Sequence, residues 1–144
     1  MEELLEITDH IVFNSERQLR KHGARCREAG VSVGLRINPQ CSTQGDHALY
    51  DPCAPGSRFG VTLDKIPSDL LELVDGLHFH TLCEQGADDL ETTLKAVEAQ
   101  FGSYLHEVKW LNMGGGHHIT REDYDVDLLI SEIKRIRETY NLEI

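Results

Sequence analysis

The sequence predicts an α/β fold that corresponds to a partial (β/α)8 TIM-type barrel, with about four consecutive strand–helix units. Short apolar segments alternate along the chain with longer amphipathic ones, which is the order of a parallel sheet with connecting helices. The short segments also alternate between apolar and polar residues, so each has two different faces. The chain has 144 residues, enough for one domain but short of the ~250 that a complete barrel needs.

The predicted elements follow from a period of two in strands and a period of 3.6 in helices. Strands are predicted at 10–14, 31–38, 76–81 and 108–113, helices at 15–30, 68–74, 88–101 and 125–140, and the first residues of a fifth strand at 141–144.

Local signals mark the boundaries of the first two units. Ser15 and Gln18 have the spacing of a capping box, which places the start of a helix after the first strand, and Gly30 marks its end. Pro39 stops the second strand. Residues 40–60 then form a long connection, and a connection of this length inside a compact domain is usually either functional or disordered.

The later helices are predicted from apolar stripes. Pro67 and Ser68 introduce a brief helix before the third strand. The next helix carries an apolar stripe at spacings of three and four, consisting of Leu90, Leu94, Val97 and Phe101. The last helix carries a longer stripe, consisting of Val126, Leu129, Ile130, Ile133, Ile136 and Tyr140.

The strand residues divide into an apolar and a polar face. The apolar face carries Ile11, Phe13, Val33, Leu35, Ile37, Leu77, Phe79, Leu111 and Met113. The polar face carries His10, Asn14, Arg36, Asn38, His78, His80, Trp110 and Asn112. A sheet covered by helices on both sides would be apolar on both, so the pattern favours a barrel with a functional interior. The alternative is an antiparallel sheet with one solvated face, against which the interleaved helices argue.

The composition narrows the choice of partners. The net charge is −11, with 40% hydrophobic and 27% charged residues, so we expect no nucleic-acid partner and no binding to an anionic membrane. No apolar run approaches the ~20 residues of a membrane span. The acidic start of the chain lacks the basic region of a signal peptide, which predicts a cytoplasmic protein with reduced cysteines.

Two motifs carry candidate chemistry. Gly114, Gly115 and Gly116 follow the fourth strand, and three consecutive glycines expose backbone N–H groups that can surround a phosphate. We expect this loop to lie where a strand ends and a helix begins. His78 and His80 share one strand face at its carboxyl end, where they could bind a metal ion, stack on a cofactor ring or be structural. A metal-dependent barrel hydrolase using His78, His80 and His117 or His118 is therefore an alternative.

The order of the motifs resembles one enzyme family. The series consists of Phe13-Asn14-Ser15, Leu35-Arg36-Ile37-Asn38-Pro39, Ser57-Arg58-Phe59-Gly60, His78-Phe79-His80 and Gly114-Gly115-Gly116. It resembles the alanine racemase-like barrel of the fold-type III decarboxylases, which use pyridoxal 5′-phosphate (PLP) and include ornithine and diaminopimelate decarboxylases. The stretches 50–60, 76–85 and 113–120 are most similar to the carboxynorspermidine (carboxyspermidine) decarboxylase branch, and the resemblance covers nearly the whole chain.

The resemblance implies roles for individual residues. Gly114, Gly115 and Gly116 would hold the cofactor phosphate, and the His80 imidazole would stack on the pyridine ring. Arg36 would help to order the site beneath the cofactor. Cys83 stands where related decarboxylases have a phosphate-contacting serine, and His117 is included on its location alone.

The resemblance also implies that other parts of the family's site lie outside residues 1–144. The Schiff-base lysine would precede this region, and the carboxylate for the pyridine nitrogen and the C-terminal β-domain would follow it. The five lysines lie away from the carboxyl ends of the strands; they are Lys21, Lys65, Lys95, Lys109 and Lys134. We therefore expect an inactive central fragment of a homodimeric lyase that converts carboxynorspermidine or carboxyspermidine to norspermidine or spermidine in polyamine biosynthesis.

Overall fold

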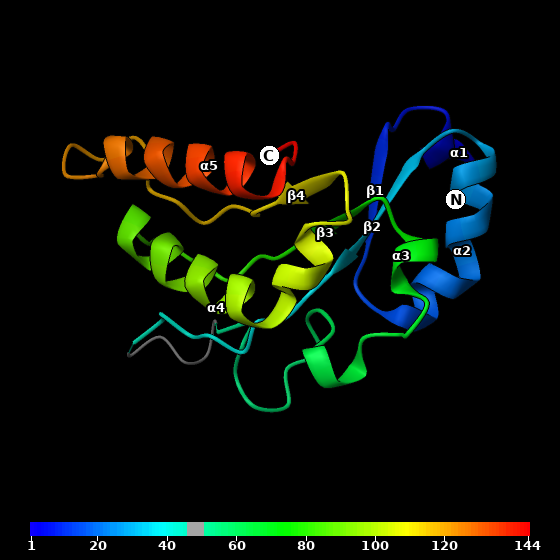
Figure 1. The fold of residues 1–144 in the computed structure, drawn as a ribbon, viewed down its shortest axis with the longest axis horizontal. Coiled ribbons are helices and arrows are strands. Elements are labelled where there is room, and N and C mark those ends of the chain that lie inside the picture. Colours follow the sequence, from blue (N-terminus) through cyan, green and yellow to red (C-terminus); the bar gives the residue numbers. More distant parts are fainter. Residues whose placement is uncertain (46–50) are drawn as a thin grey trace.

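The computed structural model describes residues 1–45 and 51–144 and contains one parallel sheet (Figure 1). Its strands are β1 (His10–Phe13), β2 (Ser32–Arg36), β3 (Gly76–His78) and β4 (Trp110–Asn112), and they lie side by side in sequence order. All three pairings between neighbouring strands are parallel. The predicted partial barrel is confirmed, and the antiparallel alternative is wrong.

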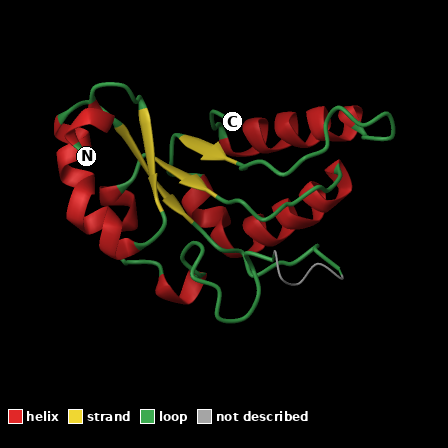
Figure 2. Cartoon of the chain, turned by 180° about the vertical axis from the view of Figure 1, so that it is seen from behind, coloured by secondary structure: helices red, strands yellow, loops and turns green. Residues whose placement is uncertain are grey.

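Helices precede, connect and follow the strands and lie outside the sheet (Figure 2). They are α1 (Glu2–Leu5), α2 (Glu16–Glu28), the 3-10 helix η2 (Leu63–Lys65), α3 (Leu70–Leu73), α4 (Ala87–Leu105) and α5 (Val126–Tyr140). Figure 1 shows α2 and α3 beside β1 and β2, with α4 and α5 at the other end of the sheet. The short α1 and η2 were not predicted, and α4 extends beyond its predicted end at Phe101.

The start of α2 shows how side chains fix a boundary. Ser15 is the N-cap, and its hydroxyl accepts a hydrogen bond from the Gln18 N–H. The Gln18 side chain returns to the Asn14 N–H at 3.0 Å, one residue earlier than in a regular capping box. At the other end, Gly30 has φ +80°, a conformation that glycine adopts without strain.

The apolar face of the sheet forms the core together with the helices. Val33, Leu35, Leu77 and Phe79 are completely buried. They belong to one cluster with helix residues that include Leu19, Leu94, Val97, Phe101 and Ile136. The stripe predicted on α5 is correct only in part, because Val126 and Ile130 are 42% and 43% exposed.

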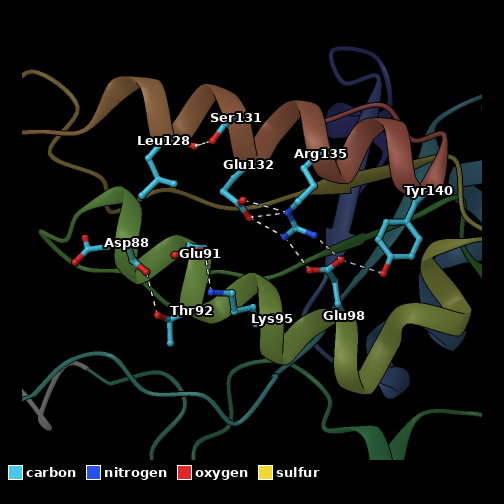
Figure 3. A network of polar contacts seen from close by, with 10 residues as sticks. All are labelled: Asp88, Glu91, Thr92, Lys95, Glu98, Leu128, Ser131, Glu132, Arg135 and Tyr140. Carbon is cyan, nitrogen blue, oxygen red and sulfur yellow. Dashed lines mark hydrogen bonds and ion pairs between the residues drawn. The ribbon is translucent and has the colours of Figure 1, made fainter.

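An ion-pair network joins α4 to α5 on the outside of the core (Figure 3). Arg135 donates to both carboxylate oxygens of Glu98 at 2.8 Å and to Glu132 on its own helix at 2.7 Å. Tyr140 donates to Glu98 at 3.2 Å. The two carboxylates raise the pKa of Arg135, and the two-pronged geometry fixes the relative position of the helices.

Pairing continues beyond the strands as isolated bridges. Ile37 pairs with Val61, and Gln85 pairs with His117, both in parallel orientation. A third parallel bridge joins Trp110 to Glu143, so the residues predicted to begin a fifth strand lie beside β4. In the described ranges, no helix combines the length and the apolar character needed to cross a membrane.

Candidate functional site

Polar side chains meet at the carboxyl ends of three neighbouring strands. The strand register places Arg36 of β2 beside His78 of β3, and His78 beside Asn112 of β4. All three belong to the face that sequence alternation predicts to be polar. In TIM-barrel enzymes, the functional groups lie at the carboxyl ends of the strands.

His78 is held by a hydrogen bond rather than left free to bind a ligand at both ring nitrogens. Its Nδ1 lies 2.9 Å from Asn112 Oδ1, and the same oxygen accepts from the Gly114 N–H at 2.9 Å. Because Gly114 donates to this oxygen, it acts as an acceptor, and His78 Nδ1 carries the proton. Burial lowers the pKa of His78, so the ring is neutral at pH 7.

The His80 side chain is more exposed than that of His78, and Arg36 holds the His80 backbone. The Arg36 Nη2 donates to the His80 carbonyl at 2.9 Å, and the Arg36 guanidinium lies 4.8 Å from the centre of the Phe59 ring. The imidazole of His80 remains exposed. Burial, followed by the Arg36 charge, lowers the pKa of His80, which favours a neutral ring available for stacking.

Two asparagines at the strand ends hold the loop that carries Phe59. Asn14 donates to the Arg58 carbonyl at 2.8 Å and accepts from the Gly60 N–H at 3.0 Å. Asn38 donates to the Phe59 carbonyl at 3.2 Å. Asn38 also donates to the Pro52 carbonyl at 3.2 Å, so both halves of the motif at 50–60 are held at the strand ends, whereas Tyr50 lies outside the described residues.

The glycine loop follows β4 and packs against the chain beyond β3. Gly114 and Gly116 have φ +72° and +91°. A Cβ on Gly114 would lie 2.5 Å from the Phe79 carbonyl oxygen, and one on Gly116 would lie 2.0 Å from the Leu82 carbonyl oxygen. The fold itself thus requires glycine at these two positions.

Gly115 differs from its two neighbours. A Cβ there would meet only His80 Cε1, at 3.8 Å, which is ordinary van der Waals contact. Within residues 1–45 and 51–144, no hydrogen bond uses the N–H groups of Gly115, Gly116 or His117. The loop therefore presents free donors beside an accessible imidazole, an arrangement that fits a phosphate attached to a flat ring.

The structure places the other two predicted site residues beside this loop. Cys83 is exposed, and its backbone nitrogen is near the position that a Cβ of Gly116 would occupy, at 3.0 Å. The Cys83 N–H donates to Gln85 Oε1 at 3.3 Å. His117 is half-buried, and its Nδ1 lies 2.8 Å from the Tyr124 hydroxyl. Tyr124 was not singled out in the sequence, because nothing local connects it to the glycine loop.

The Trp110 side chain packs on the inner face of the sheet, one layer before His78 and Asn112 along the strands. Sequence reasoning did not predict this packing role. Its indole covers Gly34 and Gly76 on the two neighbouring strands, where a Cβ would lie 2.3 Å and 2.0 Å from ring atoms. The indole Nε1 donates to Ser32 Oγ at 2.8 Å, and the His10 ring meets it edge-on at 5.4 Å. The glycines in β2 and β3 are the signal that could have indicated this large inner side chain.

The glycine loop lies between β4 and α5, as expected, but it does not reach the start of the helix. α5 begins only at Val126, with Asp125 as its N-cap, so the glycines do not form its first turn. Residues 118–125 separate the two features as a pair of turns. A bound anion would rely on the loop N–H groups and on nearby side chains instead of on the α5 terminus.

The metal-hydrolase alternative is not favoured by the geometry. The rings of His78 and His80 are 6.1 Å apart and nearly perpendicular, and His78 and His117 each use Nδ1 for a hydrogen bond within the protein. In the part of the chain that the structure describes, no three His, Cys, Asp or Glu side chains are placed to share a metal ion.

The lysines lie where the sequence predicts, away from the site. All five are exposed. Lys109 precedes β4 and pairs with Asp75 at 2.8 Å, at the amino ends of the strands. Lys95 pairs with Glu91 on the outer helix α4. The candidate site contains donors and an imidazole but no lysine from this chain.

Comparison with curated proteins shows to which enzymes the chain is similar. It is 39% identical over 99% of its length to a carboxynorspermidine/carboxyspermidine decarboxylase of Campylobacter jejuni, and 38% identical over 95% to a carboxyaminopropylagmatine decarboxylase of Synechocystis. The chain spans only about a third of each relative, 36% and 35% respectively. No protein-family model matches the chain.

Solved structures agree with this likeness. The crystal structure of Campylobacter jejuni carboxynorspermidine decarboxylase complexed with norspermidine superposes with a TM-score of 0.86 at 38% identity, over 98% of this chain and 35% of that one. A diaminopimelate decarboxylase shares the fold, with a TM-score of 0.57 at 16% identity over 94% of this chain and 39% of that one. The resemblance to this group of decarboxylases that the motifs indicate is thus confirmed.

Proposed function

We propose that this chain is the part of a PLP-dependent decarboxylase that binds the phosphate and one face of the ring of PLP, in an enzyme that acts on carboxynorspermidine or carboxyspermidine. The observation that carries the proposal is the placement of the free N–H groups of the glycine loop beside the exposed imidazole of His80. The similarity to decarboxylases over almost the whole chain supports the same assignment.

The residues at the strand ends have distinct parts in this proposal. The N–H groups of Gly115, Gly116 and His117 would hold the phosphate, and Gly115 would let it approach because nothing projects from its Cα. His80 would lie against the pyridine ring as a neutral imidazole. When bound, PLP supplies an electron-withdrawing ring that accepts the electrons released as the carboxylate leaves.

Arg36 and Asn112 would support these contacts without reacting. Arg36 holds the backbone of His80 at 2.9 Å, and Asn112 fixes the first N–H of the glycine loop at 2.9 Å. Trp110 fills the space below them with an apolar ring. These contacts keep the imidazole and the loop in one relative position, which is what a preorganised site requires.

The substrate class is a small amino acid with a cationic tail. The named substrates of the two relatives share a carboxylated aminopropyl group and differ in the tail, which is an amine in one and a guanidine in the other. A net charge of −11 favours cationic substrates of either kind. Carboxyaminopropylagmatine is the second candidate because the Synechocystis relative is almost as similar as the first.

Binding of a phosphorylated cofactor to the purified chain tests the site directly. Pyridoxamine 5′-phosphate is the preferred probe because it has no aldehyde and cannot react with surface lysines. We expect calorimetry to show binding that is weaker for pyridoxamine, which lacks the phosphate, and weaker for Gly115→Val and His80→Ala. Equal affinities for the two probes in a folded chain would contradict the proposal.

A chimera tests the reaction and the substrate. The corresponding third of the Campylobacter jejuni enzyme is replaced by this chain, and release of CO2 is measured with carboxynorspermidine, carboxyspermidine and carboxyaminopropylagmatine. We expect activity with at least one of them, and loss of that activity in the His80→Ala chimera. A folded chimera that binds PLP but acts on none of the three would refute the proposed substrate class.

A further inference from the structure

The Tyr124 side chain contacts His117 at the end of the glycine loop, although the two residues are seven positions apart in the sequence. Two turns fold the chain back, with hydrogen bonds from the Arg121 N–H to the His118 carbonyl at 2.9 Å and from the Tyr124 N–H to the Arg121 carbonyl at 3.2 Å. This fold returns the Tyr124 side chain to the imidazole of His117. The contact is therefore specified by the backbone of the segment between β4 and α5.

Of the two residues in this contact, Tyr124 is buried and His117 is half-buried. Tyr124 is 7% exposed, and its hydroxyl lies 2.8 Å from His117 Nδ1. Burial raises the pKa of Tyr124, so the group is a phenol with a proton to donate. Among the described residues, His117 Nδ1 is the hydrogen-bond partner of this hydroxyl.

Backbone hydrogen bonds to Gln85 also fix the position of His117. The Gln85 N–H donates to the Gly116 carbonyl at 3.0 Å, and the His118 N–H donates to the Gln85 carbonyl at 3.3 Å, on either side of His117. His117 also lines a cavity of about 620 Å³ together with Asn112 and Gly114. Nδ1 is engaged by Tyr124, so Nε2 is the ring nitrogen left for a ligand.

We infer that Tyr124 is a positioning residue that fixes His117 as a neutral imidazole with Nε2–H directed at the phosphate of the cofactor. A hydroxyl that donates to Nδ1 leaves the ring proton on Nε2, where it becomes a donor. Burial and the neighbouring His80 lower the pKa of His117, which is consistent with a neutral ring. The inference rests on the proposed function, because it names a further donor to the same phosphate.

Nitrogen-15 NMR of histidine-labelled chain tests the tautomer without any need for activity. In the unmodified chain we expect His117 to carry its proton on Nε2 and to accept at Nδ1. In Tyr124→Phe we expect that preference to be lost, and in the matched variant Tyr140→Phe, which removes a hydroxyl from the α4–α5 network, we expect it to be kept. A proton on Nδ1 in the unmodified chain, or the same tautomer in Tyr124→Phe, would overturn the inference.

Binding of pyridoxamine 5′-phosphate tests the consequence. Losing one well-placed donor to an anion predicts affinity about three- to tenfold weaker in Tyr124→Phe and in His117→Gln. In the double variant, we expect no loss beyond that of His117→Gln, because Tyr124 acts through His117. Additive losses would mean that Tyr124 has only a structural role, and would overturn the inference.

The outcomes separate this inference from the proposed function. If the unmodified chain binds pyridoxamine 5′-phosphate and Tyr124→Phe binds it equally well, the positioning role is wrong and the cofactor site stands. If the unmodified folded chain discriminates neither pyridoxamine 5′-phosphate from pyridoxamine nor inorganic phosphate from chloride, the cofactor site and the inference are both wrong.

Discussion

The outer and inner faces of the same four strands are built on opposite principles. On the outer face, Leu35, Leu77 and Phe79 are completely buried and share one core with the helices. On the inner face, His80 and Asn112 are exposed, and hydrogen bonds link polar groups across neighbouring strands. The outer face contributes stability through buried area, whereas the inner face leaves donors and rings available to a ligand. The outer face therefore serves folding, whereas the inner face combines the packing of Trp110 with polar groups at the strand ends that are left for binding.

The sharpest test of this contrast uses adjacent residues on opposite faces of β3. Leu77→Ala removes a completely buried side chain and should lower the free energy of unfolding by about 2–5 kcal/mol. His78→Ala removes a half-buried polar side chain and should cost less than about 1.5 kcal/mol. Urea unfolding followed by circular dichroism measures both. Equal losses would show that the two faces contribute alike to stability.

A second test asks whether the indole of Trp110 is the reason that position 76 requires glycine. Gly76→Ala places a Cβ 2.0 Å from the indole and should cost about 1–3 kcal/mol of unfolding free energy. In a Trp110→Leu background, the same change should cost much less, because the ring that it would meet is absent. The double-mutant cycle is measured by urea unfolding. Costs that simply add would refute the packing of Trp110 on Gly76.

The glycine loop allows a similar comparison between adjacent residues, because the fold requires glycine at Gly114 whereas Gly115 is left open for a ligand. Gly114→Ala requires a Cβ at φ +72° and 2.5 Å from the Phe79 carbonyl, and should cost about 1–2 kcal/mol. Gly115→Ala meets no close protein atom and should change stability by less than about 0.5 kcal/mol. Thermal unfolding and calorimetric binding of pyridoxamine 5′-phosphate are measured on both. A large loss of stability in Gly115→Ala would contradict its proposed role as an opening for the ligand.

The smallest expected effect is a pH dependence that comes from the inner face. Burial lowers the pKa of His78 below its usual value, so the unfolded chain binds a proton more readily than the folded one. The contribution of His78 is complete above the unfolded pKa of about 6.5 and is lost as pH falls from there to the lowered folded pKa. Urea midpoints at about pH 8 and pH 5.5 should therefore differ more for the unmodified chain than for His78→Gln. The same difference in both would show that His78 does not contribute.

Much of the fold was predictable because its signals are local. Ser15 at a helix start, Gly30 after a helix end and the alternation of Val33, Leu35 and Ile37 depend on residues close in sequence. The strands are shorter than predicted because the alternating pattern continues past the last ladder hydrogen bond, as at His80. The exposed Val126 and Ile130 show that a helical stripe does not specify how much of it is covered.

The sequence by itself determined the alternating faces, the glycine loop and the histidines at the end of β3, since each follows from residue type and spacing. Only the tertiary structure decided that Trp110 covers Gly34 and Gly76, and that Tyr124 returns to His117. These contacts join separate strands or the two ends of a turn, so their existence depends on strand register and backbone path. Spacing along a chain carries no information about either until the sheet has formed.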